Sequence, residues 1–321
     1  MNNDLMINNL SVNYQTDDGL VYALDQVDLL LKEGSSLGLV GETGAGKTTL
    51  AKSVMRLLPE RTARVMSGEV HYQGKDLLKE DMASIRRIRG DQIAMVFQDP
   101  MTSLNPVLTV GEQIAEAIEV HGEYSKNEAQ QKVGEILEMV GIPAARADEY
   151  PHQFSGGMKQ RVVIAIALAC NPKVLIADEP TTALDVTIQA QVLETIKELR
   201  QKLNTSMLLI THDLGVVAQN CEHVSVMYAG EIVESASVKE IFAGMKHPYT
   251  KGLFNSIPKI NVNVTRLMPI PGLMPDPTQK PQGCKFADRC PHVMEKCQQS
   301  KPELIEVSPG HHVRCYLYET I

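Results

Sequence analysis

The chain has 321 residues and a mass of 35.4 kDa, and 43% of its residues are hydrophobic and 22% charged. This composition excludes a disordered, collagen-like or coiled-coil protein, and the length favours two domains or one large domain with an extension. The net charge is −8, and aromatic residues make up 4% without any tryptophan. Nucleic-acid-binding proteins are usually basic and stack bases on aromatic rings, so we expect no nucleic-acid partner.

No segment is expected to cross a membrane. The longest apolar run covers residues 162–170, far short of the ~18–20 residues that a transmembrane helix needs. The first ten residues, MNNDLMINNL, lack the basic and apolar stretches of a signal peptide. We therefore expect a cytoplasmic chain that reaches a membrane only through partners.

In chain order, the apolar patterns predict strands alternating with helices. Strands are expected at residues 5–14, 36–40, 69–72, 174–177 and 207–210. Helices are expected from the glycine-rich loop to about Pro59, twice within 110–141, from 155 to 170, and at 186–203. The second helix of 110–141 opens with the capping-box residues Ser125 and Glu128. This alternation indicates an α/β fold with a mostly parallel sheet.

The chain changes character after a predicted hairpin at residues 224–234, which turns at Ala229 and Gly230. Residues 258–283 contain six prolines, which favour an irregular segment. Four of the six cysteines follow within a short stretch, so we expect an irregular Pro- and Cys-rich C-terminal region.

A glycine-rich loop follows the strand at 36–40 and precedes a helix. Its sequence, GETGAGKT, fits the phosphate-binding pattern G-x-x-x-x-G-K-[ST] in the required strand–loop–helix context. The backbone amides and the helix N-terminus favour a phosphate, with Lys47 reaching its β- and γ-groups and Thr48 ligating Mg²⁺. The loop residues are Gly41, Glu42, Thr43, Gly44, Ala45, Gly46, Lys47 and Thr48.

Two further segments carry candidate catalytic chemistry. Asp178 and Glu179 follow the apolar strand 174–177, at the end where open α/β sheets bind ligands. We expect Asp178 to serve Mg²⁺ and Glu179 to act as the general base that polarises the attacking water. Ser155 begins a helix in the segment FSGGMKQ and is a candidate N-cap, which presents the helix dipole to an anion.

The order of these motifs resembles the ATP-binding-cassette (ABC) ATPase family over about residues 1–255. Residues 154–160 resemble its signature sequence, Gln98 its glutamine loop, residues 183–185 its D-loop, and residues 211–213 its histidine loop. The resemblance implies a P-loop (RecA-like) nucleotide-binding domain with an antiparallel β subdomain and a helical subdomain inserted at about 99–165. Residues 256–321 would form a C-terminal extension.

The resemblance also implies roles for single residues. ATP would sit on residues 41–49, including Thr49, with its adenine stacked on the ring of Tyr14 or, alternatively, Tyr22. Lys47, Gln98, Glu179 and His212 would be catalytic, with His212 holding the γ-phosphate and orienting Glu179. Mg²⁺ would be held by Thr48, Gln98 and Asp178. The remaining nucleotide contacts would come from Ser155, Gly156, Gly157, Gln160 and Asp185, of which Ser155 and Gly157 complete the ATP site of an opposite subunit.

Three segments narrow the resemblance to the ATPase subunits of dipeptide/oligopeptide importers, a group that also includes nickel and opine importers. They are residues 99–106, residues 179–191, and residues 247–250 with the Pro- and Cys-rich tail. The group implies a second homologous ATPase, two transmembrane permease subunits and an extracytoplasmic binding protein. A similar partner, giving a heterodimer, is favoured, and an identical partner is the alternative. The chain would lie on the cytoplasmic face of the inner membrane and energise peptide import. Nickel, metallophore, opine or glutathione-like cargo is the alternative.

The four late cysteines, Cys284, Cys290, Cys297 and Cys315, lie in a segment with little else to form a core. Short units usually need a metal or disulfides, and disulfides are disfavoured in a reducing cytosol. Zinc sites usually show closer pairs, whereas these longer gaps are compatible with iron–sulfur ligation. The resemblance to peptide-importer tails favours a structural [4Fe–4S] cluster, and zinc or no metal are the alternatives.

Overall fold

The computed structural model describes residues 3–97, 103–122, 124–182, 184–256 and 270–319. The chain divides into two compact units. The first comprises Met1–Leu5, Leu31–Ser36 and Tyr72–Ile210, and the second comprises Met6–Leu30, Leu37–His71 and Thr211–Ile321. Both units combine strands and helices, which confirms the predicted α/β class.

Three parallel strands form the centre of the first unit. Ile176 of β7 pairs with Met95 of β6 and with Leu208 of β8, and every residue of these strands is buried. Burial on both faces is what parallel sheets require, and it explains why these strands are apolar runs rather than alternating patterns. The elements of the unit are β5 (Lys75–Asp76), α2 (Met82–Ile88), β6 (Ile93–Val96), α4 (Val110–His121), α5 (Lys126–Met139), α6 (Gly156–Leu168), β7 (Val174–Asp178), α7 (Val186–Leu203) and β8 (Ser206–Thr211).

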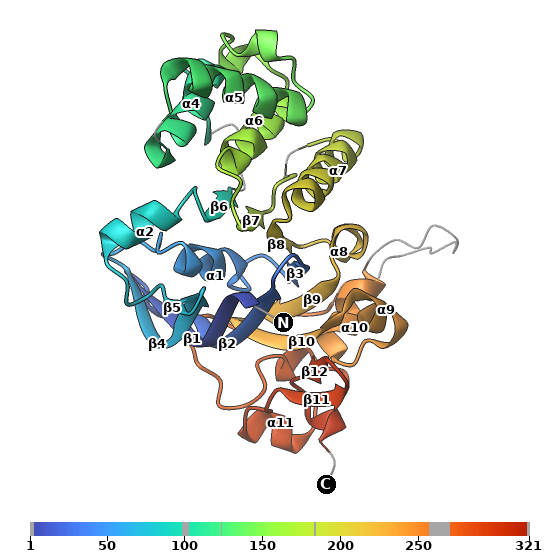
Figure 1. Ribbon diagram of the computed structural model, residues 1–321. Helices are drawn as coiled ribbons and strands as arrows, with labels where there is room; N and C mark the ends of the chain where they lie inside the picture. Colours follow the sequence, from blue (N-terminus) through green and yellow to red (C-terminus); the bar gives the residue numbers. More distant parts are fainter. Residues whose placement is uncertain (1–2, 98–102, 123, 183, 257–269, 320–321) are drawn as a thin grey trace. The chain divides into compact units, whose positions relative to one another are not determined.

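Helices α4, α5 and α6 pack against one another in the first unit (Figure 1). Thr109 and Ser125 close capping boxes with Glu112 and Glu128 at the starts of α4 and α5, and the second of these was predicted. In the part of the chain described here, no helix is both long and apolar enough to cross a bilayer. The predicted subdomain boundary at residue 99 lies outside the described residues.

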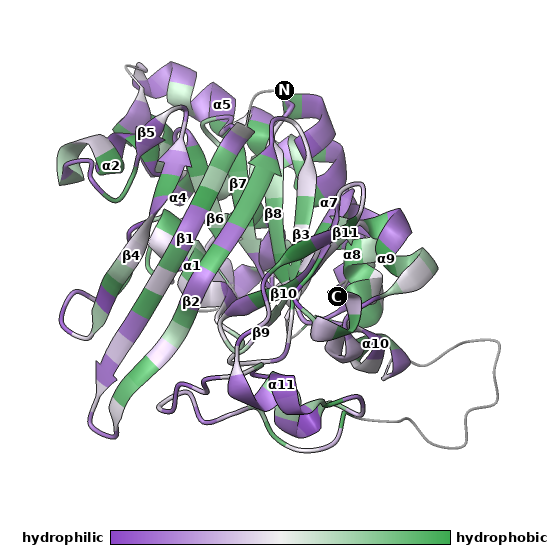
Figure 2. Ribbon diagram, turned by 90° about the horizontal axis from the view of Figure 1, so that it is seen from below, coloured by the Kyte–Doolittle hydropathy of each residue, from purple (hydrophilic) through white to green (hydrophobic). Residues whose placement is uncertain are grey.

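In the second unit, β1 lies between β2 and β4. The later part of β2 alternates buried and exposed residues, visible as bands of opposite hydropathy in Figure 2. The elements of this unit are β1 (Asn3–Thr16), β2 (Gly19–Lys32), β3 (Ser36–Val40), α1 (Lys47–Val54), β4 (Ala63–Tyr72), α8 (Leu214–Asn220), β9 (His223–Tyr228), β10 (Glu231–Ser237), α9 (Val238–Gly244), α10 (Pro248–Asn255), α11 (Glu295–Gln299), β11 (Ile305–Ser308) and β12 (His311–Val313). The outermost residues of four of these strands, β1, β2, β3 and β4, belong to the first unit.

Five neighbouring strands of a second sheet lie in this unit, in the order β11-β12-β10-β9-β3. Strand β3 pairs parallel with β9, and β9 pairs antiparallel with β10 through the predicted turn. Ala229 and Gly230 have φ angles of 45° and 82°, the left-handed pair that a two-residue hairpin turn prefers. Helix α1 ends at Val54, before the predicted Pro59, because Arg56 adopts a φ of 49°.

The C-terminal region contains more regular structure than the expected irregular segment. Strand β12 pairs antiparallel with β10, where Glu234 faces Val313, and β11 pairs with β12. Strands β11 and β12 are too short to show an alternating pattern in the sequence, and they flank a turn at Gly310. Their pairing therefore depends on the unpaired edge that β10 offers. The predicted boundary at residues 255/256 adjoins a segment outside the described residues and stays a prediction.

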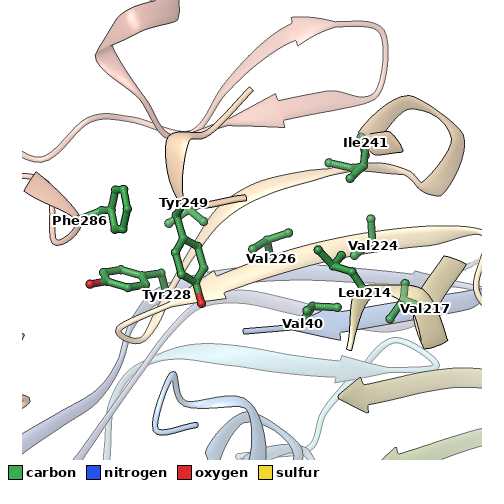
Figure 3. Packing of buried hydrophobic residues seen from close by; sticks show 11 residues of the cluster. Val40, Leu214, Val217, Val224, Val226, Tyr228, Ile241, Tyr249 and Phe286 are labelled. Atoms are coloured by element: carbon green, nitrogen blue, oxygen red, sulfur yellow. The ribbon is translucent and has the colours of Figure 1, made fainter. Parts of the chain in front are cut away.

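An aromatic cluster joins this region to the core of the second unit (Figure 3). The ring of Phe286 lies 5.2 Å from that of Tyr228 and 5.5 Å from that of Tyr249. The two tyrosine rings are 4.6 Å apart. Such contacts contribute ~0.5–1.5 kcal/mol each beyond the area they bury, so Phe286 holds the C-terminal region against the sheet.

Candidate nucleotide-binding site

The predicted phosphate loop connects β3 to α1 in the second unit. A Cβ atom on Gly41 would lie 2.2 Å from the carbonyl oxygen of Met227, and one on Gly46 would lie 2.6 Å from that of Ala23. Gly46 also has a φ of 105°. Any larger side chain would clash at either position, so the tight loop requires glycine at both.

Lys47 begins α1, and its buried ammonium group closes the loop from inside. Its Nζ donates to the carbonyl oxygen of Gly41 at 2.7 Å and to that of Glu42 at 3.0 Å. The loop therefore holds a cation beside the amides of a helix N-terminus, which is the arrangement that binds a phosphate.

The two candidate adenine platforms differ in their surroundings. The Tyr14 hydroxyl lies 3.3 Å from Oγ1 of Thr49, so this ring is attached to the end of the phosphate loop. The Tyr22 ring instead lies 5.8 Å from the ammonium of Lys280, and its backbone amide donates to Pro277. Tyr14 is thus the ring in contact with a predicted ATP-binding residue, and its role as the platform stays a prediction.

Sequence reasoning missed two residues that contact the loop from far along the chain. The guanidinium of Arg289 forms a two-bond ion pair with the carboxylate of Glu42, and the hydroxyl of Tyr249 accepts a hydrogen bond from the Glu42 amide. Burial raises the pKa of the Tyr249 hydroxyl, which therefore stays protonated. No local signal marks these contacts, since they join residues more than 200 positions apart.

The predicted carboxylates lie in the first unit. Asp178 is the buried last residue of β7, and Glu179 follows with a φ of 45°, an uncommon conformation for a residue other than glycine. The Glu179 amide donates to Ile210 at 2.9 Å, and its carboxylate accepts from the Thr182 hydroxyl at 3.0 Å. Such strained residues cluster at active sites, because the surrounding bonds hold a side chain in one direction.

The signature segment also lies in the first unit. Ser155 is the N-cap of α6, as predicted, and accepts from the Met158 amide. A Cβ on Gly157 would lie 2.4 Å from the Ile188 side chain of α7, so glycine lets the two helices approach. Gly156 is exposed, and Gln160 is fully buried.

The remaining predicted residues are distributed as follows. Asp185 is the exposed N-cap of α7 in the first unit. His212 is exposed in the second unit, just before Asp213, whose carboxylate caps α8 by accepting from two backbone amides. Gln98 lies outside the described residues.

All four late cysteines line one small pocket in the second unit, with a volume of about 10 Å³. Burial, with the neighbouring Cys297 and Cys315, raises the pKa of the Cys284 thiol to about 12, and burial also raises the pKa of Cys290 and Cys315. Across the described ranges, no group of His, Cys, Asp or Glu side chains is arranged to hold a metal ion. The predicted metal centre is therefore not confirmed.

Comparisons with known proteins assign the family. A family model described as ABC transporter matches residues 24–182, and one described as oligopeptide/dipeptide transporter, C-terminal region, matches residues 233–297. The oligopeptide transport ATP-binding protein AppD of Bacillus subtilis is 50% identical over 98% of this chain and 97% of its own. The chain belongs to the ATP-binding subunits of peptide ABC transporters. The resemblance stated from the motifs is thus confirmed.

Two further relatives bear on activity and fold. The dipeptide transport ATP-binding protein DppD of Bacillus subtilis is 49% identical over 98% of this chain and 95% of its own. The ATP-binding cassette MJ0796, solved as a dimer in a post-hydrolysis state with ADP and Pi, matches 73% of this chain and 98% of its own at 30% identity and a TM-score of 0.65. The chain is an ABC-type ATPase with the cassette fold, and ATP and Mg²⁺ are the cofactors expected for it.

Proposed function

We propose that this chain hydrolyses ATP to energise the import of dipeptides or oligopeptides through a multi-subunit ABC transporter. The observation that carries the proposal is the presence, in one chain, of a complete phosphate loop and a peptide-transporter C-terminal region. Nickel, metallophore, opine or glutathione-like cargo is the alternative. The chain would act on the cytoplasmic face of the inner membrane.

The proposed chemistry assigns one task to each group. The loop from Gly41 to Thr49 binds the triphosphate, Lys47 neutralises its charge, and Tyr14 stacks on the adenine. Thr48, Gln98 and Asp178 hold Mg²⁺, which would stabilise charge on the phosphates. Glu179 accepts a proton from the attacking water, and His212 holds the γ-phosphate and orients Glu179. The buried ammonium of Lys47 and the fixed direction of the Glu179 carboxylate support these roles.

The proposed site needs a second cassette. The segment from Ser155 to Gln160 and Asp185 would close on the nucleotide of a partner ATPase, as the dimeric state of MJ0796 suggests. We propose a similar but non-identical partner ATPase, two transmembrane permeases and an extracytoplasmic binding protein. Residues 1–255 would form the cassette and residues 256–321 its extension.

The test replaces the proposed general base. Glu179→Gln keeps the size of the side chain, so ATP affinity should change less than about threefold, whereas kcat should fall ~10²–10⁴-fold, the usual contribution of general-base catalysis. Glu194→Gln, which changes an exposed glutamate on α7, is the matched control and should retain kcat. Unchanged turnover of Glu179→Gln in the assembled transporter would refute the assignment.

Transport itself identifies the cargo. The chain and its membrane and binding-protein partners, reconstituted in vesicles, should take up labelled dipeptides or oligopeptides when ATP is supplied. Uptake of nickel or an opine, with no peptide uptake, would replace the peptide proposal with the alternative.

We further propose that the four cysteines bind a structural [4Fe–4S] cluster. Their convergence on one pocket supports this, although the pocket has room for about one water-sized sphere, so its walls must separate to admit a cluster. Iron and acid-labile sulfide near four per chain after purification without oxygen would support it. Zinc alone, or neither metal, would refute it.

A further inference from the structure

One buried arginine of the C-terminal region is bonded directly to the phosphate loop. Arg289 ends the short 3-10 helix η3 (Ala287–Arg289), and its side chain is 5% exposed. Its Nη1 and Nη2 donate to the two carboxylate oxygens of Glu42 at 2.8 and 3.0 Å. This two-bond geometry is the strongest form of ion pair available to an arginine.

Arg289 is itself held in a fixed position. Its Nε donates to the carbonyl oxygen of Pro271 at 3.0 Å, Nη2 also donates to that of Ile270 at 3.4 Å, and Nη1 also donates to the Tyr228 hydroxyl at 3.3 Å. Gly272, with a φ of 81°, lets the chain turn closely over the arginine stem. The guanidinium is therefore pre-oriented toward the loop.

Glu42 connects Arg289 to Lys47, the residue proposed to bind the phosphates. Its amide donates to the Tyr249 hydroxyl at 2.9 Å, and its carbonyl oxygen accepts from the Lys47 ammonium at 3.0 Å. Fixing the Glu42 side chain thus fixes a carbonyl that positions Lys47. Tyr249 belongs to the buried cluster with Tyr228 and Phe286 that Figure 3 shows.

The charge of Glu42 gives the pair a second effect. Its side chain is 29% exposed, so an unpaired carboxylate here would add a negative charge to a loop that must bind an anion. Arg289 cancels that charge. Met274 also contacts the loop, since a Cβ on Gly44 would lie 3.2 Å from its Cε.

We propose that Arg289 is a positioning residue of the ATP site, which holds Glu42 and cancels its charge, so that the C-terminal region sets the affinity for ATP. This inference rests on the proposed assignment of the phosphate site to the loop 41–49. Because the loop contacts the triphosphate in the ground state and in the transition state alike, Arg289 acts on affinity more than on kcat.

The experiment measures MgATP affinity of the full-length chain by calorimetry and kcat at saturating ATP. Arg289→Gln should weaken affinity roughly tenfold, as expected when a charge beside a polyphosphate loses its counter-ion at an effective dielectric of about 20, and kcat should change less than twofold. Adding Glu42→Gln to Arg289→Gln removes the uncompensated carboxylate beside the triphosphate and should restore part of the lost affinity.

Two controls separate the possible outcomes. Lys301→Gln removes two ion pairs of the C-terminal region, to Asp25 and Glu231, neither of which is a loop residue, and should leave affinity unchanged. Lys47→Ala should abolish binding. Unchanged affinity in Lys47→Ala would refute the proposed phosphate site. If Lys47→Ala abolishes binding, the phosphate site stands and the other variants decide the inference. Wild-type affinity in Arg289→Gln, or no gain in affinity when Glu42→Gln is added to it, would then refute the inference alone. If Arg289→Gln does not fold, Arg289→Lys decides, with a smaller loss of affinity expected.

Discussion

A buried charge cluster attaches the C-terminal region to β2, and its central carboxylate is the most informative group to remove. The Asp25 side chain is 5% exposed and lies 2.9 to 3.3 Å from the ammonium groups of Lys280, Lys285 and Lys301. Glu231 shares the last two lysines. Burial alone would raise the pKa of Asp25, but the three lysines outweigh it and hold that pKa far below its usual range.

We predict that Asp25→Asn destabilises the chain by ~2–3 kcal/mol at pH 7. Removing one partner of a fully buried ion pair costs ~3–5 kcal/mol. The cost is smaller here because Lys280 and Lys301 are 51% and 23% exposed and regain water, while Lys285 keeps Glu231 at 3.1 Å. At ~2–4 °C for each kcal/mol, the melting temperature should fall by ~4–12 °C.

The same variant should change the pH dependence of stability. The folded pKa of Asp25 is depressed, so its contribution is complete above the unfolded pKa of ~3.9 and is lost as the pH falls below that value. Urea unfolding followed by circular dichroism should show the wild-type advantage at pH 7 and a smaller one near pH 3. Asp17→Asn, at an exposed position, should match the wild type. A loss under ~1 kcal/mol at pH 7, or an advantage that persists unchanged to pH 3, would refute the reasoning.

Two further substitutions test local features of the site. Gly41→Ala places a Cβ 2.2 Å from the Met227 carbonyl, so the loop must shift and nucleotide titration should show affinity weakened at least tenfold. Gly244→Ala, which meets no atom within 4 Å, should bind normally, and equal affinities would contradict the steric argument. Ser155→Ala removes the cap of α6 and should cost ~1 kcal/mol, a fall of ~2–4 °C in thermal melting, whereas an unchanged midpoint would contradict it.

Features set by neighbouring residues were predictable from the sequence. The cap at Ser155, the hairpin turn at Ala229 and Gly230, and the helix at 186–203 each depend on chemistry within a few positions. The parallel strands were equally visible, because burial on both faces leaves short apolar runs such as 174–177. The phosphate loop belongs to the same class, since glycines and a lysine at fixed spacing determine it.

Contacts between distant segments were not predictable in this way. The pairing of β12 with β10 depends on an open strand edge, and the bond between Arg289 and Glu42 depends on a chain that returns after 247 positions. Neither Arg289 nor Glu42 stands out in its local sequence. The burial of the arginine cannot be predicted until its ion-pair partner is known. The convergence of the four cysteines was suggested by their clustering, but the close packing of their pocket was not.

The C-terminal region is an extension by sequence, but it packs within the second unit, which also holds the predicted phosphate loop. Phe286 fills the core beside Tyr228 and Tyr249 (Figure 3), and Tyr249 in turn accepts the amide of Glu42. Phe286 also lies 5.9 Å from the guanidinium of Arg289, which pairs with Glu42, so two contacts connect it to the loop. Because close-packed interiors transmit strain, we expect a cavity made at Phe286 to be felt at the loop rather than absorbed locally.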